Sequence, residues 1–486
     1  MNARCTGSMI SFGGLMRLVV ALAVPFVALP PASAQIAVKN QGYIPYSDAP
    51  IFYRSDDISD PVAKLQKQLE QGKAKLEYDA QDHGYLKSVL KLLDIAVSSQ
   101  TLVFSKTSFQ YPKISPEHPR ALYFNDDVYV GSVHEGKEIE LVSFDARQGA
   151  IFYLVHEQKV DKPVFERAEL DCTQCHIAAG TRGVPGVLLR SVPPTSTGTL
   201  VTGASTFITD QDSPFKERWG GWYVTGKLAH GTLANAVAPE GASGKSVTLA
   251  ALEKTFDPPA YLAPGSDVVA LLVLAHQTQM HNLITLTNYK TRIARHALAG
   301  QSAGAAGSAE SALPPPAADA PLPEATRRQF ERPAEQLLRY LLFANETELP
   351  GLDGKQVIAS SAYAREFASR GPRDSKGRSL RDFDLGTRIF RYPCSYLIYS
   401  EAFDSLPEAA KTYVYHRLLQ ILSGQDQDAD FESLSAPDRQ AILEILLETK
   451  SGLPQEWQDY AHSHQLQVAG AHDQSGQQTP HRGTRK

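Results

Sequence analysis

The feature that most constrains this chain is the pentapeptide Cys172-Thr173-Gln174-Cys175-His176. Two thiols at this spacing can each add to a vinyl group of a porphyrin, and a histidine directly after the second thiol can bind the iron. The run is therefore typical of the covalent attachment of a c-type haem. A bare C-x-x-C pair also occurs in zinc sites and in thioredoxin-like proteins. Here the sequence offers neither a second cysteine pair nor a surrounding βαβ pattern, which argues against both.

The N-terminus has the pattern of a secretory signal peptide. Arg4 and Arg17 precede an apolar run over residues 18–29, and small residues follow up to Ala34. We predict a signal peptide over residues 1–34, cleaved after Ala34. The apolar run is too short for a comfortable membrane span. Because c-type haem is attached outside the cytoplasm, the export signal agrees with the pentapeptide, and together they predict a periplasmic protein.

The cysteines predict a chain without an internal disulfide. Cys5 would leave with the signal peptide, and if Cys172 and Cys175 hold the haem, Cys394 has no partner. Cys394 lies in the apolar and aromatic stretch 390–399, which predicts a buried, unreactive thiol. A reactive or ligating thiol is the alternative.

Composition excludes some classes of partner. The formal net charge is -5 at pH 7 and no basic stripe with interleaved aromatic residues is present, so we expect no nucleic-acid binding. No segment after the signal peptide is long and apolar enough to span a membrane, so we expect no integral membrane segment in the mature protein. Roughly 450 residues would remain after cleavage, enough for two or three domains.

Local patterns predict an α+β fold. Runs of β-forming residues separated by turn signals predict a small antiparallel meander over residues 101–104, 121–124, 128–133, 139–144 and 151–156. Apolar residues at helical spacing predict helices over residues 60–71, 85–97, 266–297, 333–343, 409–422, 436–449 and 456–464.

These elements divide the chain into regions. We predict a haem-binding domain with a small antiparallel sheet plus helices over residues 35–298, and a mainly α C-terminal domain over residues 326–465. Between them, residues 299–325 are rich in Ala, Gly and Pro, which predicts a linker. The polar residues 466–486 predict a disordered tail.

The stretch that follows the pentapeptide offers further haem contacts. The loop around Pro185 is a candidate for the backbone carbonyl that accepts the N–H of the iron-binding histidine, and an ordinary surface turn is the alternative. Trp219 and Trp222 are candidates to wall the haem, and Arg218 could pair with a propionate. An aromatic turn within the core is the alternative for those three residues.

The second axial ligand of the iron decides what such a protein does. A Met suits electron transfer, a second His lowers the potential, and an open position allows a small molecule to bind or react. Met280 is the one methionine outside the predicted signal peptide. We expect the ligand on the helix predicted over residues 266–297, at Met280 or His276, with His281 beside them and His230 as a further candidate. The alternative is that Met280 and His276 are ordinary core residues.

Several stretches resemble a family of exported bacterial proteins described as cytochrome c domain-containing. They are residues 103–110, 119–126, 172–176, 213–223, 276–282 and 391–400. The resemblance covers most of the mature chain and implies one covalent haem and, by inference, electron transfer. The Ala- and Pro-rich segment after Ala299 looks like an insertion in the family pattern.

Three functions remain open. The leading hypothesis is a periplasmic monohaem cytochrome that transfers electrons and has a redox partner protein. A simple carrier requires only about one hundred residues, and the surplus here could dock that partner. The alternatives are a haem-dependent oxidoreductase of the peroxidase type, with His276 or Arg218 acting beside the haem, and a gas or redox sensor. The sequence therefore leaves open whether the chain is an enzyme, with the electron carrier favoured.

Overall fold

The structure, a computed structural model, describes residues 44–81, 83–204, 206–228, 231–232, 255–305, 322–349 and 353–468. It combines an antiparallel sheet in the N-terminal part with a mainly helical C-terminal region, which confirms the predicted α+β class. The predicted signal peptide and the predicted tail from residue 469 onward lie outside the described residues. None of the helices in the described ranges offers the long apolar stretch that crossing a bilayer requires.

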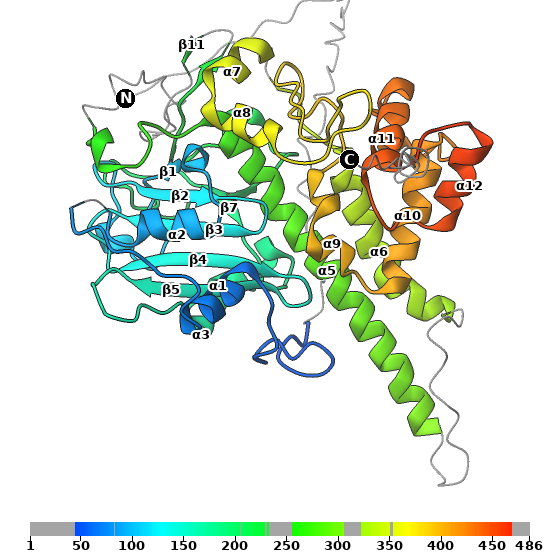
Figure 1. The fold of residues 1–486 in the computed structure, drawn as a ribbon, viewed down its shortest axis with the longest axis horizontal. Helices are drawn as coiled ribbons and strands as arrows, with labels where there is room; N and C mark the ends of the chain where they lie inside the picture. The colour runs from blue at the N-terminus through cyan, green and yellow to red at the C-terminus, as the bar shows by residue number, and fades with distance from the viewer. Residues whose placement is uncertain are drawn as a thin grey trace, which may run out of the picture. The chain divides into compact units, whose positions relative to one another are not determined.

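One seven-stranded antiparallel sheet forms the N-terminal part, in the order β6-β5-β4-β3-β2-β1-β9 (Figure 1). Its strands are β1 (Thr101–Val103), β2 (Arg120–Phe124), β3 (Val128–Val133), β4 (Glu138–Asp145), β5 (Gly149–His156), β6 (Glu166–Arg167) and β9 (Trp222–Tyr223). Two small sheets pair β7 (Leu189–Ser191) with β8 (Phe207–Thr209) and β10 (Lys227–Leu228) with β11 (Gly231–Thr232). The predicted meander from β1 to β5 is confirmed, whereas β9, which pairs with β1 from far along the chain, was not predicted.

Side chains alternate between the two faces of this sheet, and helices cover both faces. One face shares a hydrophobic core with α1 (Pro61–Glu70) and α2 (Leu86–Leu92). The opposite face, which we call the α5 face, shares a core with the long helix α5 (Val268–Ala305). The α5 face carries the buried residues Val103, Phe124, Tyr129, Phe144 and Phe152.

Helix α1 begins at a buried cap that ties it to the sheet. Asp60 Oδ1 accepts hydrogen bonds from the backbone N–H of Val62 and Ala63, at 3.0 and 3.2 Å. Tyr153 of β5 donates its hydroxyl to Asp60 Oδ2 at 2.8 Å. One carboxylate therefore satisfies the first turn of the helix and fixes its position on the strand.

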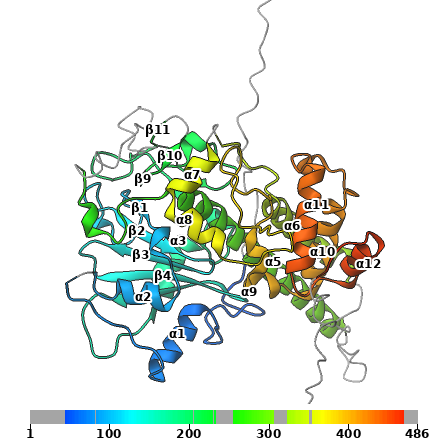
Figure 2. The ribbon, with the colours of Figure 1, turned by 45° about the horizontal axis from the view of Figure 1, so that its top comes forward.

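Helix α5 links the sheet to the C-terminal helices (Figure 2). Asp267 starts it, since its Oδ1 accepts from the backbone N–H of Val269 and Ala270 at 2.8 and 3.1 Å. Every residue from 268 to 289 is buried. A helix that is buried all round must have packing partners on every side. The helix predicted over residues 266–297 is confirmed, and it continues further, to Ala305.

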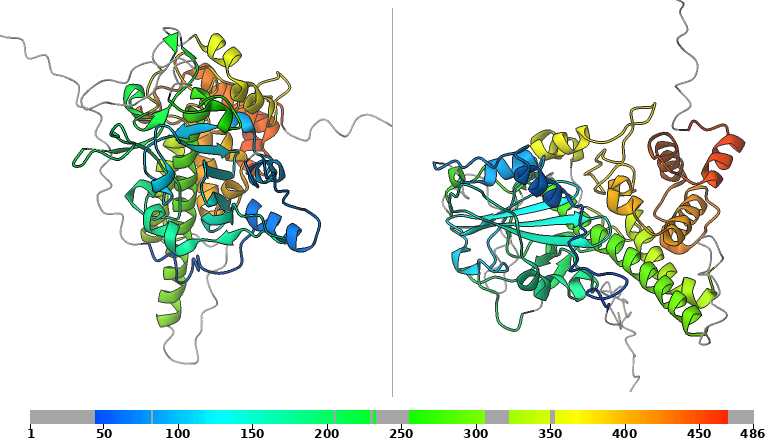
Figure 3. Two further views of the ribbon diagram at one scale, coloured as in Figure 1. Left: turned by 90° about the vertical axis from the view of Figure 1, so that its left-hand side faces the viewer. Right: turned by 60° about the horizontal axis from the view of Figure 1, so that its bottom comes forward.

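Helices dominate the C-terminal region. They are α6 (Glu324–Leu341), α7 (Gly354–Ser360), α8 (Ala362–Ser369), α9 (Glu401–Asp404), α10 (Glu408–Leu422), α11 (Ala436–Thr449) and α12 (Gln455–Ser463). Helix α6 lies beside α5, as the right-hand view of Figure 3 shows, and also contacts α10. The helices predicted over 409–422, 436–449 and 456–464 are confirmed. The helix predicted to begin at Pro333 begins earlier, because that proline lies inside α6.

The sheet, α5 and the C-terminal helices share one core. Contacts group the described residues into one compact unit. A single cluster of buried side chains contains Phe152 of β5, Leu272 of α5 and Leu418 of α10. Side chains from both of the regions predicted as domains, 35–298 and 326–465, therefore meet in this cluster. The first residues of the linker predicted over 299–325 belong to α5, and residues 306–321 lie outside the described residues.

Trp457 anchors α12 to the rest of this core, and its removal should destabilise the fold. Its ring is fully buried, and Nε1 donates to the carbonyl oxygen of Tyr415 at 3.1 Å. We expect Trp457→Ala to lower the free energy of unfolding by about 3–5 kcal/mol, since it leaves a large cavity. Urea unfolding followed by circular dichroism measures this change. Val97→Ala, at an exposed apolar position, is the control and should cost less than about 0.5 kcal/mol; equal losses would contradict the assignment.

Candidate haem-attachment site

The pentapeptide forms the end of helix α3 (Glu169–His176), which contacts β5. Cys172 is half-buried and packs against the core of the α5 face, whereas the Cys175 side chain is exposed. Both are free thiols on one helical turn. Burial raises the pKa of the Cys172 thiol to about 11, so it is protonated at neutral pH. Cys394 is fully buried, as predicted, and burial raises its pKa well above the usual range.

A hydrogen bond to the following loop orients His176. Its Nδ1 lies 2.9 Å from the carbonyl oxygen of Gly186. Since a carbonyl oxygen only accepts, Nδ1 carries the proton and donates it, and in the neutral ring Nε2 keeps a lone pair. Burial lowers the pKa of His176, which favours the neutral ring at pH 7. The acceptor is the immediate neighbour of Pro185, in the loop predicted to supply this carbonyl.

Asn282 of α5 holds the loop that carries this carbonyl. Its Oδ1 accepts from the backbone N–H of Val187 at 3.1 Å, and its Nδ2 donates to the carbonyl oxygen of Val187 at 2.7 Å. Gly186 approaches so closely that a Cβ there would come 2.1 Å from Asn282 Oδ1. Glycine is therefore required by the contact with α5. Asn282 acts on His176 through Gly186, as a positioning residue.

These contacts determine on which side of His176 an iron could bind. The two ring nitrogens of an imidazole point to opposite sides of the ring. Nδ1 points toward Gly186, and α5 lies directly behind Gly186 through Asn282. Nε2 is therefore the nitrogen that could hold an iron, which would lie on the side of the ring away from Gly186.

Met280 lies on a different side of α5 from Asn282. Met280 and Asn282 are two positions apart on α5, so in a helix with about 3.6 residues per turn they point to opposite sides. Asn282 faces the loop after the pentapeptide, and Met280 is fully buried in the core. Met280 therefore lies where the alternative prediction of an ordinary core residue put it, and its role as an axial ligand stays a prediction. His230 lies outside the described residues.

His276 is also fully buried in the core. It lies four positions before Met280 and shares its face of α5. Its Nδ1 lies 2.6 Å from Gln211 Oε1, and its Nε2 lies 2.7 Å from Ser395 Oγ. Burial lowers its pKa to about 3, so the ring is neutral. Both nitrogens are hydrogen-bonded inside the core, so in this structure His276 joins α5 to the C-terminal region, and its roles as axial ligand and as distal acid stay predictions.

Arg218, Trp219 and Trp222 belong to the core turn that was the alternative prediction. The Arg218 side chain is fully buried, and its Nε and Nη2 donate to backbone carbonyl oxygens, each at 2.8 Å. Trp219 packs edge-on against Phe215, with ring centroids 5.9 Å apart. Trp222 lies in β9 and donates Nε1 to the carbonyl oxygen of Arg190 at 2.9 Å. These contacts do not support the predicted pairing of Arg218 with a propionate.

A charged pair that sequence reasoning missed lies next to the pentapeptide. Arg120 of β2 and Glu140 of β4 form an ion pair on the α5 face, with side chains 19% and 13% exposed. Burial is the largest influence on the pKa of both Cys172 and His176. Of the two charges, Glu140 raises both pKa values and Arg120 lowers them. In the sequence, Glu140 alternates with apolar residues and resembles an ordinary solvent-facing position. Only the strand register shows that it faces the pentapeptide.

The donor set fits a covalently attached haem. Two free thiols lie on one helical turn, and the neighbouring imidazole is fixed with Nε2 free of the hydrogen bond to Gly186. Arg120, the cation of the neighbouring ion pair, could form an ion pair with an acidic group of the haem. Within the described ranges, no group of three or more His, Cys, Asp or Glu side chains is arranged to hold a metal ion directly.

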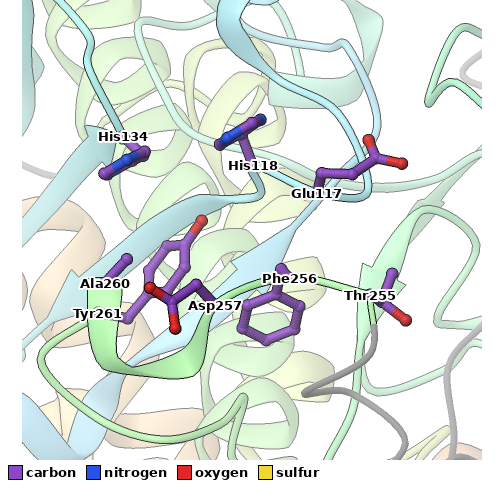
Figure 4. A pocket seen from close by; sticks show the side chains of 8 residues that line it. All are labelled: Glu117, His118, His134, Thr255, Phe256, Asp257, Ala260 and Tyr261. Carbon is purple, nitrogen blue, oxygen red and sulfur yellow. The ribbon is translucent and has the colours of Figure 1, made fainter.

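A separate pocket of about 410 Å³ lies elsewhere in the N-terminal part (Figure 4). The imidazole rings of His118 and His134 stack there in parallel, with centroids 5.6 Å apart. Its lining consists of Glu117, His118, His134, Thr255, Phe256, Asp257, Ala260 and Tyr261. None of the pentapeptide residues lines it, so this pocket is distinct from the candidate site.

Comparisons of the chain with known protein families, with curated proteins and with solved structures find no match.

Removing the amide of Asn282 should release the loop that orients His176. We expect Asn282→Ala to lower the free energy of unfolding by about 2 kcal/mol, since it leaves two buried backbone groups of Val187 unpaired. We also expect the ¹⁵N NMR signals of His176 to lose the pattern of a single Nδ1–H tautomer, which a purely structural role would leave intact.

Asn288→Ala on the same helix is the matched control. Asn288 makes only longer hydrogen bonds, of 3.3 Å to Ser405 and 3.4 Å to Arg292. Its substitution should cost less than about 1 kcal/mol and leave the His176 tautomer unchanged. A His176 spectrum that is the same in both variants would contradict the positioning role of Asn282.

Proposed function

We propose that this chain is an exported c-type haem protein that binds one haem covalently through Cys172 and Cys175, with His176 as an iron ligand. The observation that carries the proposal is the hydrogen bond from His176 Nδ1 to Gly186. Metal-binding histidines donate their second ring N–H in this way, which fixes the tautomer and the direction of the ligating nitrogen. A histidine in an ordinary surface turn would not need a hydrogen bond that fixes its ring orientation.

The two thiols are suited to the attachment. In each thioether the sulfur forms a bond to one vinyl carbon and the thiol hydrogen goes to the other carbon, so no oxidant or reductant is consumed. Cys172 and Cys175 are three positions apart, so α3 presents both thiols on one face, the half-buried Cys172 against the core and the exposed Cys175 toward solvent. Once bound, a haem would supply a one-electron iron couple.

We propose electron transfer in the periplasm, with a protein redox partner, as the activity of this site. The proposal draws on the pentapeptide, the signal peptide predicted over residues 1–34 and the resemblance noted above. Exposure of Cys175 would leave one edge of the haem near the surface, where electrons can pass to a partner. The imidazole held by Gly186 would keep its geometry through both oxidation states.

One observation favours a second candidate, a haem-dependent oxidoreductase or a gas sensor. Met280 is fully buried in the core, and both nitrogens of His276 are hydrogen-bonded. The ligands expected for a simple electron carrier are thus engaged in the core. An iron without a second protein ligand could bind a small molecule.

Production in a host with haem-maturation machinery tests the attachment. We expect a haem that stays with the polypeptide after denaturation, because thioether bonds survive unfolding. The double variant with Cys172→Ser and Cys175→Ser should lose it. Cys394→Ser is the matched control and should retain it, since Cys394 is buried in the C-terminal core. A native protein without covalent haem would refute the proposed function.

Carbon monoxide distinguishes the two activities. We expect Met280→Leu, which conserves volume and should cost less than about 1.5 kcal/mol, to leave the absorption spectra of both oxidation states unchanged. A reduced spectrum that shifts with carbon monoxide in the native protein would favour the oxidoreductase or the sensor. A low-spin spectrum indifferent to carbon monoxide would favour the electron carrier, and loss of that behaviour in Met280→Leu would identify Met280 as the ligand.

A further inference from the structure

We propose that Arg120 binds an anionic group next to His176: a carboxylate of the haem itself or a small anion on the iron. This inference rests on the proposed function. It transfers to Arg120 the anion-binding role that the sequence suggested for Arg218, whose side chain is fully buried and bonded to backbone carbonyls.

The strand register places Arg120 beside the pentapeptide. Gly131 pairs with Glu140, and one pleat further along the sheet Val142 pairs with Phe152. The ring of Phe152 lies 5.0 Å from the His176 ring, centroid to centroid. Because side chains two positions apart on a strand share a face and neighbour each other, the ion pair of Glu140 lies diagonally from Phe152, the residue that contacts the His176 ring, and both of its charges act on the pKa of His176.

The guanidinium is fixed in place above a glycine. Its Nε lies 2.7 Å, and its Nη2 2.3 Å, from where a Cβ of Gly131 would be. Any larger residue at position 131 would therefore displace the Arg120 side chain. The absence of a side chain there lets the arginine lie flat across β3 and reach Glu140 on β4.

Glu140 is itself held rigidly, so it can act as the positioning residue for Arg120. Its Oε1 accepts from Ser108 Oγ at 2.7 Å and from Gln110 Nε2 at 2.8 Å, and its Oε2 accepts from Arg120 Nη2. A carboxylate that accepts from three donors keeps its orientation. The arginine therefore needs little reordering when an anion arrives.

The Arg120 guanidinium has a hydrogen-bond donor without an acceptor in the described part of the chain. A guanidinium offers five N–H donors in a rigid fork, and the described contacts of Arg120 use Nη2 for Glu140. Its Nε is buried and has no hydrogen-bond partner within the described part of the chain. A buried donor without an acceptor is costly. An acceptor that arrives with the haem or with its ligand would remove that cost.

The test compares Arg120→Gln with Arg388→Gln in the haem-loaded protein. Arg388 is a matched control in the C-terminal region, since it is also half-buried and pairs with a carboxylate, that of Asp438, at 2.9 Å. Two quantities are measured: the reduction potential in buffer without small anions, and the affinity of the oxidised protein for fluoride, followed by absorption.

If Arg120 pairs with a haem carboxylate, loss of its charge disfavours the reduced state. The ratio of reduced to oxidised protein at a fixed potential should then fall about tenfold, which is about 59 mV for one electron. If Arg120 instead contacts an anion on the iron, the potential should match that of the control, and the affinity for fluoride should fall tenfold or more. Either result supports the proposal and identifies the source of the anion.

The proposal is overturned if Arg120→Gln and Arg388→Gln have the same potential and the same affinity for fluoride. Should Arg120→Gln fail to acquire haem, Arg120→Met, which keeps an unbranched stem without the charge, takes its place, and values equal to those of the Arg388→Gln control would then overturn it. A native protein without haem refutes the proposed function first, which is a different result from a loaded protein indifferent to Arg120.

Discussion

The candidate site depends on the two hydrogen bonds between the Asn282 side chain and the backbone N–H and carbonyl oxygen of Val187. It places Gly186 against α5, and Gly186 in turn orients the imidazole of His176. The direction of one ring nitrogen is thus set by the position of a helix far along the chain. Because α5 is buried all round from residue 268 to 289, that position is set by everything packed against the helix.

The buried polar side chains of α5 fix both its rotation and its position. Gln277 donates to the carbonyl oxygen of Asn125, at the turn between β2 and β3, at 2.7 Å, and accepts from Tyr396 of the C-terminal region. His276 joins Gln211 to Ser395 in the same way. A rotation of α5 by one residue would leave these groups unpaired inside the core, which costs far more than a shift of apolar contacts. Specific hydrogen bonds therefore fix which face of α5 meets the loop after the pentapeptide.

Local pattern was sufficient to predict the elements, but not the contacts between them. Alternating residues in β4 and β5 and the capped, periodic residues of α5 gave elements close to those observed. The pairing of β9 with β1 depends on chain closure over a long distance, and no local signal reports it. The same limit explains Met280: periodicity placed it correctly on an apolar face, yet α5 is apolar on more than one face. Whether that face meets the pentapeptide or the C-terminal helices is a tertiary property. The Arg120–Glu140 pair was missed for a related reason, since it depends on strand register.

The length of the chain has a structural explanation that does not require an enzyme. A simple electron carrier requires about one hundred residues, because short helices can hold its haem. Here the imidazole is held from behind by α5, and a helix buried on every side needs a sheet on one face and further helices on the other. The C-terminal helices are therefore part of what orients His176, even though none of their residues contacts it in the described structure. Under the proposed function, what distinguishes a carrier from a haem enzyme would lie beside His176, where the charges of Arg120 and Glu140 act on its pKa, and not in the size of the protein.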